Sequence, residues 1–232
     1  EYTAIAGVTD ERIPSKEALI HPSLAPDVVI LDAAMTVATP PRLYFGTGIR
    51  AVDHAVETWC SINVTPLTEA SSLHALRILP QALAKSKADP DDLDTRLACL
   101  IGAWLSIQGV ATGVDLGASH GIGHVLGGTA GMPHGETSCV MLPHVLRYNN
   151  AVNGERQAIL AAAMGDPDTS AADQIQALVA SLDLPGRLRD AGVSKEILPT
   201  IAEESMLDMW IPTNPRTIAG PQDVLPLLQA AW

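Results

Sequence analysis

The sequence contains few aromatic residues and few cysteines. Its 232 residues include four Trp, three Tyr and one Phe, so aromatic residues make up 3% of the chain. The core must therefore be aliphatic, and a hydrophobic share of 47% excludes an intrinsically disordered chain and favours packed helices. The cysteines, Cys60, Cys99 and Cys139, form no CxxC pair and are too few for a disulfide framework. We expect them to be reduced, buried thiols, as is typical of a cytoplasmic protein.

Positive charge and long apolar runs are also scarce. Fourteen Lys and Arg oppose 26 Asp and Glu, which gives a formal net charge of −12 and disfavours binding to nucleic acid. No run of about eighteen apolar residues is present, so no membrane-spanning helix is predicted. The first residues do not resemble a signal peptide. Because no Met begins the chain, we expect a fragment or a processed product.

The apolar pattern changes at the pair Pro40-Pro41. Before it, Asp27–Asp32 is a short β-branched apolar run, which predicts a buried strand. After it, apolar residues recur at spacings of three and four, which predicts helices. These helices are expected at residues 47–61, 66–87, 91–110, 153–164, 169–183, 194–209 and 221–232. Pro80 is expected to kink or divide the second of them. The sequence thus predicts a mainly α protein with a short strand-bearing lead.

Four of the seven histidines form a candidate site. His120 and His124 are four positions apart, so on a helix they share one face and could meet one metal ion. His134 lies in a Pro-His-Gly turn, and His54 lies in the middle of the first predicted helix. A single such histidine is usually structural, but the four together indicate a functional site.

Several motifs together resemble one known family. They are Asp-His-Ala-Val-Glu at 53–57, His-Gly-Ile-Gly-His-Val-Leu-Gly-Gly at 120–128, Pro-His-Gly at 133–135, and Leu-Pro-His-Val-Leu-Arg-Tyr-Asn at 142–149. This ordered set resembles the iron-containing (group III) alcohol dehydrogenase superfamily, closest to its maleylacetate reductase branch.

The resemblance covers nearly the whole chain and implies how it is organised. Residues 1–40 would be the end of a dinucleotide-binding domain and its crossover segment. Residues 41–232 would be the helical catalytic domain, which carries the metal site in metal-dependent members. No GxGxxG motif is present, so we expect these 232 residues alone to bind a nicotinamide nucleotide weakly or not at all.

The resemblance also implies roles for individual residues. The metal ligands of the alcohol dehydrogenases correspond to His54, His120 and His134, and His124 corresponds to the residue near the nicotinamide and the proton path. The fourth ligand in those relatives is an Asp, and Arg50 occupies its position in this chain. A divalent ion about 4 Å from a guanidinium is disfavoured by roughly 8 kcal/mol at an effective dielectric constant near 20. A full zinc ligand set supplies roughly 10–16 kcal/mol, so we expect weak metal binding.

The resemblance thus predicts an NAD(P)-dependent oxidoreductase that transfers hydride to the carbonyl of a small molecule such as a keto acid. Its cofactor would be NAD(H) or NADP(H), and it would form a homodimer. Arg50 is predicted to polarise the carbonyl or hold a carboxylate, and His124 to donate or relay the proton. Asp53, about 100° around the helix from His54, is expected to face away from the site.

Alternatives stay open at this stage. Arg50 could form a salt bridge to Asp53 or Glu57. The protein could be an iron- or zinc-dependent alcohol dehydrogenase with a three-histidine site, or a non-catalytic helical module. A metallohydrolase is disfavoured because no Glu follows His120 in the HExxH manner.

Overall fold

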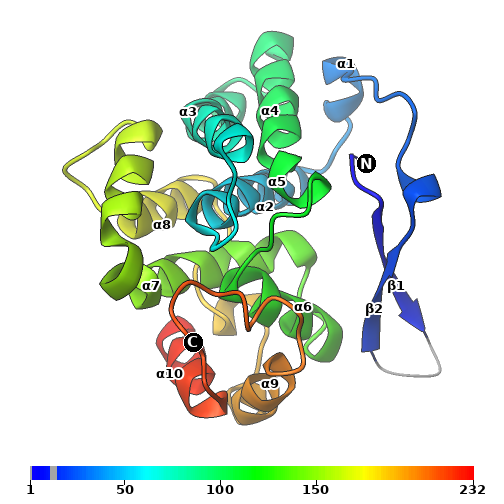
Figure 1. Ribbon diagram of the computed structural model, residues 1–232. Helices are drawn as coiled ribbons and strands as arrows, with labels where there is room; N and C mark the ends of the chain where they lie inside the picture. The colour runs from blue at the N-terminus through cyan, green and yellow to red at the C-terminus, as the bar shows by residue number, and fades with distance from the viewer. Residues whose placement is uncertain (1, 11–14) are drawn as a thin grey trace.

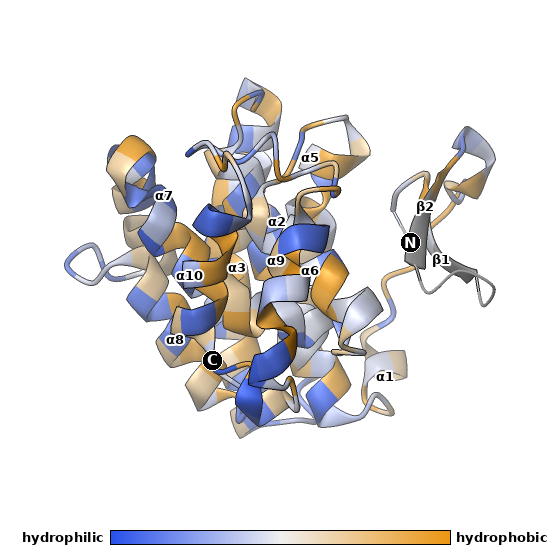
Figure 2. Ribbon diagram, turned by 90° about the horizontal axis from the view of Figure 1, so that it is seen from below, coloured by the Kyte–Doolittle hydropathy of each residue, from blue (hydrophilic) through white to orange (hydrophobic). Residues whose placement is uncertain are grey.

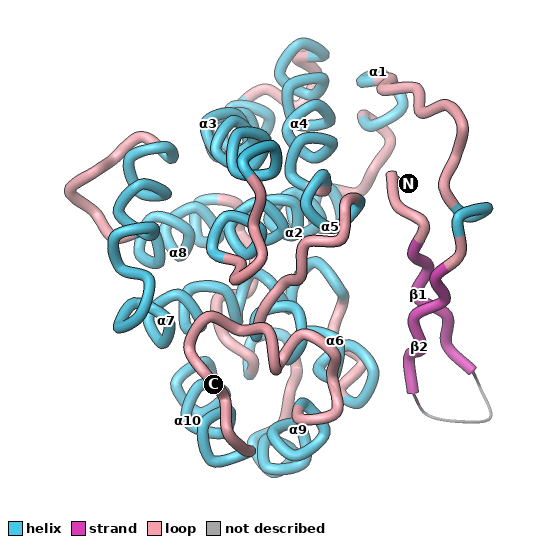
Figure 3. The backbone as a smooth tube through the Cα atoms, in the orientation of Figure 1, coloured by secondary structure: helices cyan, strands magenta, loops and turns pink. Residues whose placement is uncertain are grey.

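The computed structural model describes residues 2–10 and 15–232. It opens with an antiparallel hairpin of β1 (Ile5–Asp10) and β2 (Ser15–Ile20), in which Ile5 pairs with Ile20. The hairpin lies beside the helical body, and among the described residues it holds all of the strand structure (Figure 1, Figure 3). The predicted mainly α fold, with strand confined to the lead, is confirmed.

The predicted strand at Asp27–Asp32 is wrong. The segment is irregular and follows the short 3-10 helix η1 (Pro22–Leu24), and it leads into α1 (Ala33–Thr36). Val28 and Ile30 are 76% and 83% exposed. A strand needs a partner to satisfy its backbone groups, and no other described segment lies in position to pair with this one.

Helix α2 (Pro41–Cys60) forms the centre of the first layer. It begins six residues before the predicted start, because a proline at the first helical turn sets a helical backbone and needs no N–H partner there. Ile49, Val52 and Val56 have no exposed surface and form one buried stripe. The stripe packs against α3 (Pro66–Ala88) and α7 (His134–Met164).

Helix α3 continues through Pro80 as one element, so of the two predicted effects of this proline, a kink or a division, the division does not occur. Proline removes one backbone hydrogen bond, but the buried residues Leu76, Leu79 and Leu83 on either side hold the helix against its neighbours. The single helix predicted at 91–110 is two, α4 (Leu93–Ser106) and α5 (Gln108–Ala111).

The remaining helices form the second layer below α2 (Figure 1). They are α6 (Ala118–Thr129), the first part of α7, α9 (Leu198–Ser205) and α10 (Pro221–Ala231), with α8 (Ala171–Ser181) packed against α7 and the 3-10 turns η2 (Arg189–Ala191) and η3 (Lys195–Ile197) between α8 and α9. Helix α7 bends at Asn153, where the backbone leaves helical angles, and this is where a new helix was predicted to start.

Helix α7 contributes to both hydrophobic cores of the protein. One core joins α2, α3, α7 and α8, and the other joins α6, α7, α9 and α10. Single helices carry both hydrophobic and hydrophilic residues (Figure 2), as expected for helices that pack on one side. No described helix is both long enough and apolar enough to cross a membrane.

Candidate active site

Glu57 connects α2 to the start of α6. The N-terminal turn of a helix has backbone N–H groups without partners inside the helix, and a carboxylate there is stabilised by the helix dipole. Glu57 accepts hydrogen bonds from the backbone N–H of Gly117 at 3.0 Å, Ser119 at 2.9 Å and His120 at 3.2 Å. It also lies 2.8 Å from His120 Nδ1, so it fixes the orientation of that ring.

Asp53 and Arg50 continue this buried cluster along α2. Asp53 Oδ2 accepts a hydrogen bond from the Ser119 hydroxyl at 2.7 Å, and Asp53 Oδ1 lies 3.5 Å from His120 Nδ1. The expectation that Asp53 faces away is therefore wrong, because α6 packs over this side of α2. Arg50 Nη1 donates to Ser138 Oγ at 3.0 Å and lies 4.0 Å from Asp53 Oδ2. The Arg50–Asp53 salt bridge that the sequence left open is present.

Burial shifts the ionisation of these groups. It raises the pKa of Asp53 to about 6, against the opposing effect of Arg50. Burial, with Asp53 adding to it, raises the pKa of Glu57 to about 8. The pKa of the Arg50 guanidinium falls to about 10 and still leaves it charged at neutral pH. Burial, followed by the Arg50 charge, lowers the pKa of His54 and His120 well below the usual value, so both rings are neutral.

The four predicted histidines lie together, although they come from α2, α6 and the first residue of α7. The His54 and His120 ring centroids are 4.7 Å apart, and the His124 and His134 rings stack at 6.0 Å with 6° between their planes. Trp210 adjoins both α6 histidines, with ring centroids 5.6 Å from His120 and 5.0 Å from His124.

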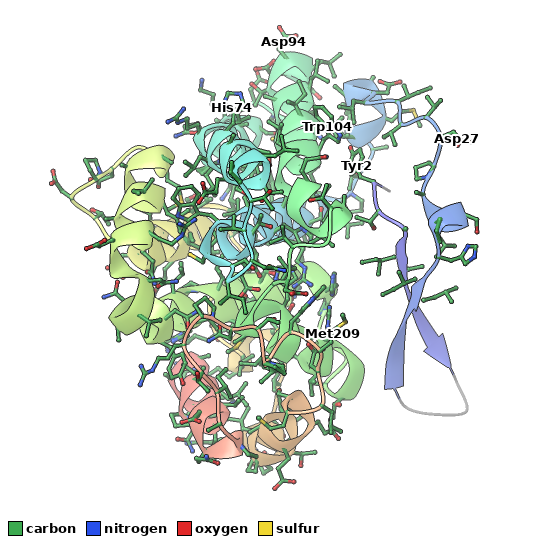
Figure 4. All side chains as sticks on the ribbon, in the orientation of Figure 1. Tyr2, Asp27, His74, Asp94, Trp104 and Met209 are labelled. Atoms are coloured by element: carbon green, nitrogen blue, oxygen red, sulfur yellow. The ribbon has the colours of Figure 1, made fainter. Side chains whose placement is uncertain are left out.

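Trp210 and Asp208 belong to a loop between α9 and α10 that sequence reasoning did not connect to the site. Figure 4 labels Met209 on this loop. Asp208 Oδ2 lies 2.8 Å from His124 Nδ1. The two residues are 84 positions apart, and no periodicity or motif in the sequence links them.

A cavity of about 430 Å³ lies between this cluster and the hairpin. Arg50, His54, His124 and His134 line it on the helical side, and Ile5 and Ile20 line it on the hairpin side. Its volume is in the range that holds small-molecule ligands, and most of its polar groups come from the predicted site residues.

The residues here do not fit a tightly bound divalent metal. Asp53, Glu57 and His120 offer ligand atoms within 4.8 Å of one another. The oxygens of Glu57, however, already accept three backbone N–H groups and contact His120 Nδ1, and the Arg50 guanidinium lies beside Asp53. The set of His54, His120 and His134 has the same buried cation at its side, which repels a metal ion.

The chain also matches known proteins. Residues 45–232 match the sequence model of a protein family that is described as "Fe-containing alcohol dehydrogenase family, C-terminal". The chain belongs to this family. Lactaldehyde reductase of Escherichia coli K12 is 33% identical over 241 residues, which cover 100% of the chain and 62% of that protein. The chain therefore spans about three fifths of the length of this relative.

Solved structures agree with this assignment. A putative alcohol dehydrogenase from Ralstonia eutropha JMP134 superposes with a TM-score of 0.93 at 33% identity, covering 100% of the chain and 64% of that structure. Maleylacetate reductase from Rhizobium sp. strain MTP-10005 gives a TM-score of 0.89 at 30% identity, with the same coverage. The family resemblance, with maleylacetate reductases among the neighbours, is confirmed, and the chain is a helical domain of an oxidoreductase family.

Proposed function

We propose that the native protein is an NAD(P)-dependent oxidoreductase that reduces the carbonyl group of a keto acid. In this proposal residues 1–40 are the end of the dinucleotide-binding domain and the crossover, and residues 41–232 form the helical catalytic domain. The observation that carries the proposal is a buried, charged Arg50 that lines the cavity beside His54 and His124. The cytoplasmic location and the homodimer stay predictions.

Arg50 is suited to hold a substrate carboxylate. Its side chain is 6% exposed, and its Nε–H has no hydrogen-bond partner among the residues that the structure describes. The nearest described carboxylate oxygen, Asp53 Oδ2, lies as far as 4.0 Å from Arg50 Nη1, so the charge of this buried cation favours a further anion in the cavity that Arg50 lines. A planar guanidinium also matches a carboxylate better than an ammonium does. The adjacent carbonyl oxygen would then lie in the field of the same cation.

The reaction needs a hydride and a proton. A reduced nicotinamide, when bound, would supply the hydride to the carbonyl carbon, and the carbonyl π electrons would move onto the oxygen. The cavity of about 430 Å³ suits a nicotinamide ring and a small substrate. In this direction the His124 ring starts protonated on both nitrogens and gives the oxygen the proton from Nε2, which yields a hydroxy acid and leaves the neutral ring with its hydrogen on Nδ1 beside Asp208. The His124 side chain is 29% exposed, so solvent can return the proton.

One observation favours a second candidate, an iron- or zinc-dependent alcohol dehydrogenase with three imidazole ligands. His120 Nε2 is buried and has no hydrogen-bond partner within the described chain. Its Nδ1 contacts Glu57, and a carboxylate behind a histidine is common at metal sites. A metal ion would satisfy Nε2, whereas Arg50 opposes it.

Two measurements on the native protein test these candidates. Oxidation of NADH and NADPH is followed with a panel of keto acids and matched neutral aldehydes, and metal content is measured by elemental analysis. We expect turnover with keto acids and a metal content well below one equivalent, because the Arg50 guanidinium repels a divalent ion. Stoichiometric metal whose removal abolishes activity would favour the second candidate. No turnover with either substrate class would favour a non-catalytic module.

A further inference from the structure

We infer that Asp208 is a positioning residue that holds His124 in the tautomer and orientation required for proton transfer. The inference rests on the proposed function, because it assigns the role of Asp208 through His124. Asp208 Oδ2 lies 2.8 Å from His124 Nδ1. A carboxylate accepts hydrogen bonds, so the hydrogen of the neutral ring lies on Nδ1 and the lone pair lies on Nε2.

Asp208 is itself held firmly in place. Its Oδ1 accepts the backbone N–H of Trp210 at 2.9 Å, and its own N–H donates to the Ser205 carbonyl at 3.0 Å. The side chain is 12% exposed. Both carboxylate oxygens are therefore engaged, one by the loop and one by the imidazole, and the carboxylate cannot turn freely away from His124.

The approach of this loop to α6 depends on Gly121. A Cβ atom there would lie 3.0 Å from Asp208 Oδ1 and 3.0 Å from Ile211 Cδ1, which is closer than most real contacts. The glycine lets the carboxylate reach the histidine one turn further along the same helix. Gly121 thus leaves the space in which Asp208 can contact His124.

Among the described residues, the remaining contacts of His124 leave one ring nitrogen for a substrate. His134 stacks on the ring at a centroid distance of 6.0 Å, and Trp210 lies 5.0 Å away at an interplanar angle of 37°. With the rings beside it and Asp208 at Nδ1, the imidazole presents Nε2 to the cavity that it lines. In the oxidation direction Nε2 accepts the alcohol proton, and the carboxylate stabilises the imidazolium that forms.

The test compares Asp208→Asn and Asp208→Glu in the native protein with the control Glu203→Gln. Glu203 is an exposed residue on α9, so its substitution removes the same charge outside the site. An Asn can donate to Nδ1 and so favours the other tautomer. We expect Asp208→Asn to lower kcat about 100-fold or more with little change in KM, in line with the wrong-tautomer effect. Asp208→Glu should recover part of the loss, and Glu203→Gln should retain full activity.

A second measurement does not depend on activity. Nitrogen-15 NMR of labelled histidine, with the His124 signals assigned by their loss in His124→Gln, reports which ring nitrogen carries the hydrogen. We expect Nδ1–H in the native protein and Nε2–H in Asp208→Asn. An unchanged tautomer, or a kcat within threefold of the native value, would overturn the inference. If the native protein shows the expected tautomer but no turnover, the proposed function fails and the pair is structural.

Discussion

Replacing Arg50 by Gln removes the charge of the proposed carboxylate site and nearly preserves its size. Arg50 is 5% exposed, so water screens it weakly. A guanidinium and a carboxylate about 4 Å apart attract by about 4 kcal/mol at an effective dielectric constant near 20. At about 1.4 kcal/mol for each tenfold change, this energy corresponds to a loss of up to about 1,000-fold in kcat/KM.

The loss should be specific for charged substrates. The assay measures kcat/KM for a keto acid and for a neutral aldehyde of similar size, in the native protein, in Arg50→Gln and in the control Arg147→Gln. Arg147 lies on α7 outside the cavity and pairs with Asp173, so its substitution should leave both values unchanged. If Arg50→Gln lowers kcat/KM equally for both substrates, Arg50 does not bind a carboxylate.

The same substitution should reduce stability, because Arg50 is the cation beside the buried carboxylate of Asp53. Without Arg50, the buried carboxylate of Asp53 loses the cation that lies 4.0 Å away. The pKa of Asp53 should then rise further above about 6. The double variant Arg50→Gln, Asp53→Asn should regain part of the lost stability in thermal unfolding. It should not regain keto acid activity, which separates the structural effect from the substrate effect.

Three further predictions follow from buried groups. Arg50→Asp should increase metal uptake in elemental analysis, because it replaces the repelling cation by a carboxylate ligand. An unchanged metal content would refute the claim that Arg50, which stands where the relatives have an Asp ligand, weakens metal binding. Gly135→Ala should destabilise the protein by about 3 kcal/mol, since its Cβ would lie 2.5 Å from the Gly46 carbonyl carbon, whereas Gly128→Ala meets nothing within 4 Å and should be neutral or stabilising in the same unfolding assay. Burial raises the pKa of the Cys60 thiol to about 12, so little thiolate forms at pH 8, and a thiol reagent should react with it only after denaturation.

Local patterns in the sequence were sufficient for several helices. Apolar residues at spacings of three and four mark α2 and α3, and the prolines at positions 66 and 221 mark helix starts, whereas α6 and the first part of α7 were not among the predicted helices. These signals lie within one or two turns of a single helix, so they predict the helix without knowledge of the segments that pack against it. The strand expected at Asp27–Asp32 failed for the opposite reason, since a strand exists only with a neighbour.

The candidate site also contains some features that the sequence predicts and others that only the structure reveals. The sequence alone identified the four imidazoles to consider, because His54, His120, His124 and His134 lie in motifs that can be read along the chain. The family resemblance identified Arg50, which stands where the relatives have an Asp ligand. Only the tertiary structure shows which side chains contact and orient these residues. The Glu57 carboxylate meets residues 117–120 at the start of α6, and Asp208 meets His124 across 84 positions. Such contacts depend on how helices cross, and burial then sets the ionisation of each group, which no local pattern encodes.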